Sequence, residues 1–221
     1  MHQKQRQMSE TFRLGALLTV VGGFLDTYTY LSRGGVFANA QTGNIVLLGL
    51  SLAQGNYEML LHYLIPILAF AAGVMVTDMV RAHFRPRPAI HWRQLIVAAE
   101  FLILLMVAYV PPGRWDAAVN VAVSFVCAMQ VESFRKIRGN AVATTMCTGN
   151  LRSATEQIFH YVRTRDPDTR KTILSYYEIV VFFALGATLG AALSALFAEK
   201  AILFCCLFLI IAFLSMFAKE I

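Results

Sequence analysis

The sequence predicts an all-α integral membrane protein: an inverted 3+3 repeat with six transmembrane helices and two short re-entrant half-helices. The 221 residues are 57% hydrophobic and 14% charged, whereas soluble domains are roughly 45–50% apolar and about 25% charged. A segment ending in Thr-Gly-Asn occurs twice, and the basic loops fall on one side of the membrane in only one arrangement. We expect one membrane domain, residues 1–221, with repeats over about 11–111 and about 116–218.

The repeat places an acid inside an apolar helix ahead of a Thr-Gly-Asn motif that opens the next helix. Asp26 precedes the motif at 42–44, and Glu132 precedes the motif at 148–150. The differences 132 − 26 and 150 − 44 are both 106, so the spacing holds without gaps. A fixed offset of this kind indicates a duplicated structural unit.

Each half is predicted to contain a long helix, a short Thr-Gly-Asn helix and two further long helices. We expect helices over about 12–32, 42–53, 58–83, 93–110, 116–136, 148–163, 172–197 and 201–218. Thr42 and Thr148 are expected to cap the short helices, because threonine is a favourable N-cap. Glycines spaced four residues from another small residue, at 73 and 77 and at 186 and 190, predict close helix packing.

Loop charge decides between eight crossings and six. If both short helices span the membrane, the basic loop from Arg85 to Arg93 lies opposite the basic N-terminus, which the positive-inside rule opposes. If both are re-entrant, that loop, the N-terminus, the Arg135–Arg138 cluster and the Arg163–Lys171 turn all lie inside. We therefore expect six crossings with cytoplasmic N- and C-termini. Irregular backbone at membrane depth is tolerated only where it is buried in protein or lines a water-filled cavity.

A binding site is predicted where the two half-helices meet. Their free backbone N–H groups favour an anion, the asparagine amides donate and accept, and the glycines permit close approach. The substrate-binding candidates are Thr42, Gly43, Asn44, Thr148, Gly149, Asn150 and Arg152. The alternative is structural: the motif is a plain helix cap and the two tips pack on each other.

Asp26 and Glu132 are the candidates for proton coupling, because a carboxylate inside a membrane is costly and by default indicates function. The alternative is a buried acid that pairs with the backbone or with a nearby arginine at position 33, 135 or 138. Glu100 is a weaker candidate, because the other half has no matching acid.

Several function classes find no support in the sequence. It contains no nucleophile elbow, phosphate-binding loop or dinucleotide fingerprint, so no enzyme activity and no cofactor are predicted. The four cysteines lie in or beside apolar segments without metal-ligand spacing, so no metal is expected. The net charge of +6 comes from short loops between apolar runs and does not indicate nucleic-acid binding.

Two stretches carry a family resemblance. The sequence resembles the YoaK-like family of uncharacterised bacterial membrane proteins, domain-of-unknown-function family 1275, at both of that family's motifs. The first motif is matched by Gly23–Asp26, Gly34–Phe37 and Gln41–Asn44, and the second by Val131–Arg135 and Cys147–Asn150. The likeness covers nearly the whole chain. It implies about six membrane helices and a bacterial inner-membrane location, and it brings no substrate.

We therefore expect a small-solute transporter or channel, proton-coupled or anion-binding, whose partners are a small solute or ion and the lipid bilayer. The alternative is a non-transporting membrane scaffold or partner protein. In that case the small-residue faces of the third and seventh helices would be contacts in a homo-oligomer.

Overall fold

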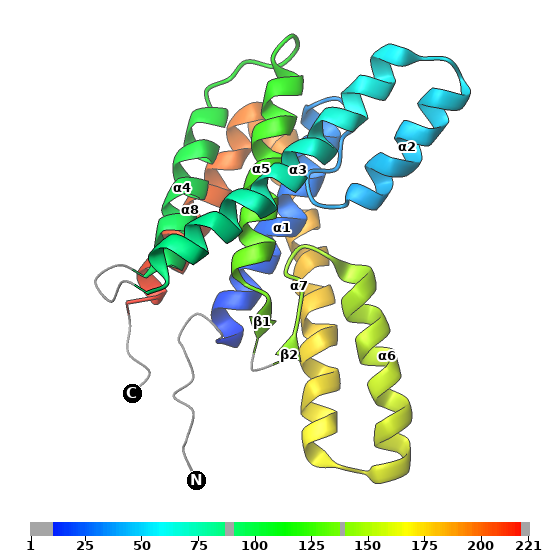
Figure 1. Cartoon of the computed structure of the whole chain (residues 1–221), viewed down its shortest axis with the longest axis vertical. Helices are drawn as coiled ribbons and strands as arrows, with labels where there is room; N and C mark the ends of the chain where they lie inside the picture. The colour runs from blue at the N-terminus through cyan, green and yellow to red at the C-terminus, as the bar shows by residue number, and fades with distance from the viewer. Residues whose placement is uncertain (1–10, 87–90, 138–139, 218–221) are drawn as a thin grey trace.

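The computed structural model describes residues 11–86, 91–137 and 140–217, which are mostly helical (Figure 1). Arg87, Arg138, the first ten residues and the last four, which include the predicted end of repeat two, lie outside the described residues. The elements are α1 (Phe12–Ser32), α2 (Gln41–Ala53), α3 (Tyr57–Phe84), α4 (Trp92–Val107), α5 (Asp116–Ser133), β1 (Lys136–Ile137), β2 (Asn140–Ala141), α6 (Cys147–Thr164), α7 (Pro167–Phe197), a 3₁₀ turn (Ala198–Ile202) and α8 (Leu203–Ser215). Every predicted helix has a counterpart.

The helices α1, α3, α4, α5, α7 and α8 form a bundle, and the two Thr-Gly-Asn helices, α2 with 13 residues and α6 with 18, stand on one side of it (Figure 1). Within the bundle α1 packs against α7, α3 against α5, and α4 against α8. The short helix α2 packs against α3, and α6 packs against α7. Figure 1 shows that α2 and α6 both begin near mid-height, α2 leading to the upper end and α6 to the lower end.

Three stretches of the described chain are long and apolar enough to cross a membrane: α1, α3 and the run Pro167–Ser215. The last has 49 residues, and at about 1.5 Å per residue it is more than twice the roughly 30 Å of a hydrocarbon core. The chain reverses inside this run, because Ala198 takes a left-handed φ of 49° and the 3₁₀ turn follows. Large apolar side chains such as Leu68, Met75 and Met79 lie exposed on α3, as lipid contact requires. The chain is therefore an integral membrane protein with an all-α body.

Glycines allow α1 and α7 to approach closely. A Cβ at Gly186 would overlap the carbonyl of Val20, and one at Gly190 would lie 2.8 Å from the carbonyl oxygen of Phe24. On α3, a Cβ at Gly73 would lie 2.6 Å from the carbonyl oxygen of Phe125 on α5. The predicted close packing is confirmed. Because these contacts lie within one chain, the small-residue faces are not available as the oligomer contacts of the scaffold alternative.

Of the boundaries that differ from the sequence prediction, two have a clear structural cause. α5 ends at Ser133 rather than 136, because the following residues form a short antiparallel hairpin whose Ile137 is buried against Gly15 of α1. α7 begins at Pro167, five residues before the predicted start. The carboxylate of Asp166 accepts a 2.9 Å hydrogen bond from the Thr169 N–H, and proline is well suited to the first helical position. The predicted charged turn is therefore mostly helix.

Candidate functional site

The two Thr-Gly-Asn motifs open α2 and α6, but neither threonine caps its helix. The N-cap residues are Ala40 and Met146, and neither helix has a side-chain cap. Thr42 and Thr148 lie one residue inside their helices with exposed side chains. The prediction that they are N-caps is wrong, because another residue of the motif satisfies the backbone of each preceding loop.

That residue is the asparagine. Asn44 accepts a 3.0 Å hydrogen bond from the Phe37 N–H and donates a 2.6 Å bond to the Phe37 carbonyl. Asn150 makes the same pair of bonds with Ala143, at 3.3 and 2.7 Å. Phe37 and Ala143 are also 106 residues apart, so the contact recurs at the repeat offset. Both asparagines are buried and hold their own loops closed.

The motif glycines differ in their surroundings. A Cβ at Gly43 would lie 2.9 Å from the Phe37 ring, so this glycine is packed. A Cβ at Gly149 would meet nothing within 4 Å, and Gly149 is exposed. Of the predicted binding residues, Thr42, Thr148 and Gly149 therefore present open surface, and the two asparagines do not.

Asp26 is buried on α1 and binds the loop that leads into α2. Its Oδ1 accepts hydrogen bonds from the Asn39 N–H at 2.6 Å and the Ala40 N–H at 3.3 Å. The carboxylate thus lies at the start of α2, where the helix dipole favours negative charge.

Glu132 has a different environment, although it aligns with Asp26. It forms ion pairs with Arg81, at 3.1 Å, and with Arg135. The difference follows from helix length, because α5 ends one residue after Glu132, whereas α1 continues for six residues beyond Asp26. The structure does not bring the two acids together. Of the structural alternatives, Asp26 binds backbone and Glu132 binds arginine.

Arg152 lies on the exposed face of α6 and does not meet Asp26 or Glu132. Its Nε donates a 2.8 Å bond to Glu156, one helical turn away, and 79% of its side chain is exposed. In the described parts of the chain, no group of three His, Cys, Asp or Glu residues is arranged to hold a metal ion.

The two loops before the short helices meet beside α1, at residues the sequence analysis did not single out. The Asn39 amide donates a 2.8 Å bond to the Gly22 carbonyl. The Gln130 amide donates to the Leu18 carbonyl at 2.9 Å and to Thr144 Oγ1 at 3.4 Å. Asn39, Gln130 and Thr144 are at most 1% exposed. A glutamine inside the apolar α5 was the signal that could have found this cluster.

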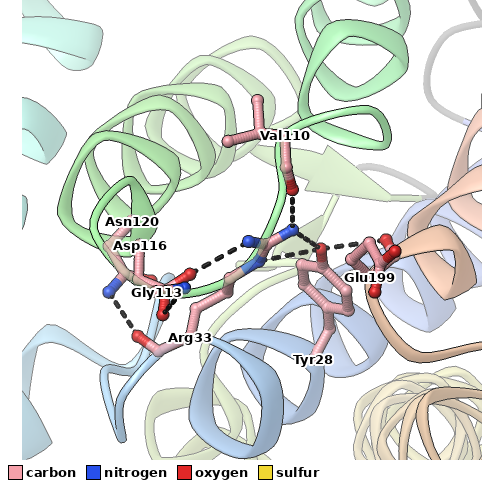
Figure 2. Close-up of polar contacts among 7 residues, drawn as sticks. All are labelled: Tyr28, Arg33, Val110, Gly113, Asp116, Asn120 and Glu199. Atoms are coloured by element: carbon pink, nitrogen blue, oxygen red, sulfur yellow. Dashed lines mark hydrogen bonds and ion pairs between the residues drawn. The ribbon is translucent and has the colours of Figure 1, made fainter.

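A second cluster missed from sequence surrounds Arg33, just beyond the end of α1 (Figure 2). The guanidinium is fully buried and donates to Asp116 at 2.9 Å, to the Val110 carbonyl at 2.9 Å, and to the Tyr28 hydroxyl at 2.9 and 3.1 Å. A buried arginine requires this full set of partners. Arg33, one of the arginines considered as partners for the buried acids, pairs with Asp116 instead of Asp26.

The same cluster joins the end of α1 to three other parts of the chain. Tyr28 donates a 3.0 Å bond to the Glu199 carbonyl in the turn before α8. The Asn120 side chain of α5 donates a 2.7 Å bond to the Arg33 carbonyl. Figure 2 shows the α4–α5 turn wrapped over the guanidinium. The Arg33 cluster is therefore a structural clamp for one end of the bundle.

Comparison with known proteins agrees with the membrane architecture. The chain is 27% identical over 184 residues to the UPF0700 transmembrane protein YoaK of Bacillus subtilis (strain 168), which covers 80% of each protein. No solved structure matches the chain. The family described as "Protein of unknown function (DUF1275)" matches residues 14–215, nearly the whole described bundle. The chain belongs to this DUF1275 family.

Proposed function

We propose that the protein is a small-solute transporter or channel of the cell inner membrane, built as an inverted 3+3 repeat with both termini cytoplasmic. Pairwise helix contacts support the repeat. α1 packs on α7 as α5 packs on α3, α2 packs on α3 as α6 packs on α7, and α4 packs on α8. If α1 is exchanged with α5, α2 with α6, α3 with α7 and α4 with α8, each of these helix pairs becomes another pair on this list or remains the same pair.

Six crossings and two re-entrant half-helices agree with the course of the chain. α2 and α6 start near mid-height and leave in opposite directions (Figure 1). The 13 residues of α2 cover about 20 Å at 1.5 Å per residue, less than a hydrocarbon core of about 30 Å. α8 also has 13 residues, but it continues directly from the 3₁₀ turn Ala198–Ile202 and packs against α1 and α4 in the bundle. The end of α3, the strands β1 and β2 and the turn between α6 and α7 lie in the lower half of Figure 1. The sequence is rich in basic residues at these places, in agreement with the positive-inside rule.

The observation that carries the transport proposal is the polar surface at the start of α6. This helix begins at mid-height beside apolar helices, yet Thr148, Gly149, Arg152 and Glu156 are all exposed. Charged side chains at membrane depth are tolerated where they face a water-filled cavity. A water-filled path that reaches the start of α6 from the cytoplasmic side is the simplest arrangement that satisfies them.

The two half-helix ends differ in what they offer a solute. The start of α2 is occupied by the Asp26 carboxylate, whereas α6 has no side-chain cap and carries Arg152 one turn further on. We assign anion binding to the start of α6 for these reasons. We assign proton coupling to Asp26, because its protonation would weaken the bonds that hold the loop before α2. Glu132, paired with two arginines, is the less suitable of the two acids.

Cysteine accessibility tests the proposal. In a variant without the native cysteines, Thr148→Cys should react with a membrane-impermeant thiol reagent in inverted vesicles, and Thr42→Cys should react in intact cells. Met75→Cys, on the exposed apolar face of α3, is the matched control and should not react. Reaction at neither threonine position, in protein shown to be folded, would contradict a water-filled path and favour a scaffold.

A further inference from the structure

Glu100 is a buried acid that neither repeat symmetry nor the candidate site explains. It lies eight residues after the start of α4, about 12 Å along a helix of 1.5 Å rise per residue. Its side chain is fully buried, and neither carboxyl oxygen has a hydrogen-bond partner in the part of the chain that the structure describes. Within the described residues it also forms no ion pair.

This environment favours a neutral carboxylic acid. An ionised carboxylate with no cation and no donor is far costlier to bury than its protonated form. Packing does not require an acid here, because α8 aligns with α4 in the second repeat, packs against it and contains no acidic residue. Glu100 is therefore a costly residue whose retention needs a chemical reason.

A row of polar side chains runs along one face of α5. The row, here named the polar stripe, consists of Asn120, Ser124, Cys127 and Gln130, spaced by four, three and three residues as one helix face requires. All four are at most 1% exposed. The Oδ1 of Asn120, the Oγ of Ser124 and the Oε1 of Gln130 have no hydrogen-bond partner among the described residues. Buried polar atoms of this kind commonly bind water molecules.

Cys127 connects the polar stripe to Glu100. Val97 and Leu104, which lie on the same face of α4 as Glu100, pack in one buried cluster with Cys127 of α5 and Cys205 of α8. Among the described residues, the titratable groups that α5 and α8 contribute to this cluster are the thiols of Cys127, Cys205 and Cys206. The surroundings contain proton-exchanging groups and no counter-charge.

We propose that Glu100 is a buried proton-binding residue and that the polar stripe delivers the proton. The ligand is a proton taken from water in the stripe. The carboxyl group holds it as the O–H of a neutral acid, and its release to water leaves a carboxylate. A contribution of Glu100 to proton coupling, beside Asp26, rests on the function proposed above, but its protonated state does not.

Infrared difference spectroscopy on the full chain in lipid vesicles tests the protonated state. At neutral pH, wild type minus Glu100→Gln should contain the C=O stretch of a carboxylic acid, and Glu100→Asp should shift that band. Glu132→Gln is the matched control and should remove a carboxylate band instead, because Glu132 is paired with two arginines. A carboxylate band in the Glu100→Gln difference would overturn the proposal, whatever a transport assay gives.

Proton delivery is tested by the rate at which that band shifts after transfer to D₂O. Ser124→Ala and Cys127→Ala should keep the acid band but slow its shift several-fold. Thr188→Ala, on the exposed face of α7, should leave the rate unchanged. An unchanged rate in both stripe variants would overturn the delivery route.

Discussion

At the scale of single residues, the cluster around Arg33 depends on a buried charge whose partners must all be present. Its guanidinium has no exposed surface, and its ion-pair partner Asp116 is 21% exposed. Removing one partner of such a pair leaves an uncompensated charge, which is much worse than replacing both with apolar side chains. Replacing both Arg33 and Asp116 with apolar residues should therefore destabilise the fold less than replacing either one alone.

We predict that Arg33→Met lowers the free energy of unfolding by about 3–5 kcal/mol, because it strands Asp116. The double variant Arg33→Met with Asp116→Leu should recover part of this loss. Denaturant unfolding in detergent micelles measures both, with Arg152→Met as an exposed control that changes little. A single variant as stable as wild type would show that the clamp is not needed.

The motif asparagines allow a second residue-scale prediction. Asn44→Ala and Asn150→Ala should each cost about 1–3 kcal/mol, because each leaves a backbone N–H and carbonyl of its loop without partners. Similar losses at both positions are expected, since the two side chains make equivalent bonds. Thermal unfolding of the purified protein gives the comparison. A loss at one position alone would argue against equivalent roles in the two halves.

At the scale of helices, two glycines distinguish a packing role from a proposed binding role. Gly186 lies against the backbone of α1, whereas a Cβ at Gly149 meets open space. Because backbone atoms cannot move aside as a flexible side chain can, α1 leaves no room for a Cβ at Gly186. The second glycine has no packing reason within the chain to be glycine.

We predict that Gly186→Ala severely reduces the yield of folded protein. Gly149→Ala should fold normally and gain up to about 0.5–1 kcal/mol from helix propensity. If a solute approaches the start of α6, Gly149→Ala should nevertheless block its passage, which a vesicle flux assay would show. Stable Gly149→Ala protein with unchanged flux of an identified solute would remove this position from the proposed site.

At the scale of the whole molecule, apolar runs and turn residues predict the positions of the helices well, because both depend on local composition. They predict the end of α5 and the environment of Glu132 poorly. Ile137 lies beyond the end of α5 and packs in a buried apolar cluster that includes Phe12 of α1, a contact distant in sequence. The Arg33 clamp was missed for the same reason, since its partners at 110, 116 and 199 come together only in the folded bundle.

The six-crossing topology predicts which loops are accessible from each side of the membrane. With six crossings, the α4–α5 turn lies outside and the turns after α3 and α6 lie inside. Cysteines placed at the exposed positions Arg114, Arg85 and Arg170 should separate accordingly. Arg114→Cys should react with an impermeant reagent in intact cells, and the other two only in inverted vesicles. With eight crossings, the Arg85 position would lie outside with a basic loop facing the wrong side. Reaction of Arg85→Cys in intact cells would therefore replace the half-helix topology with one in which α2 spans the membrane.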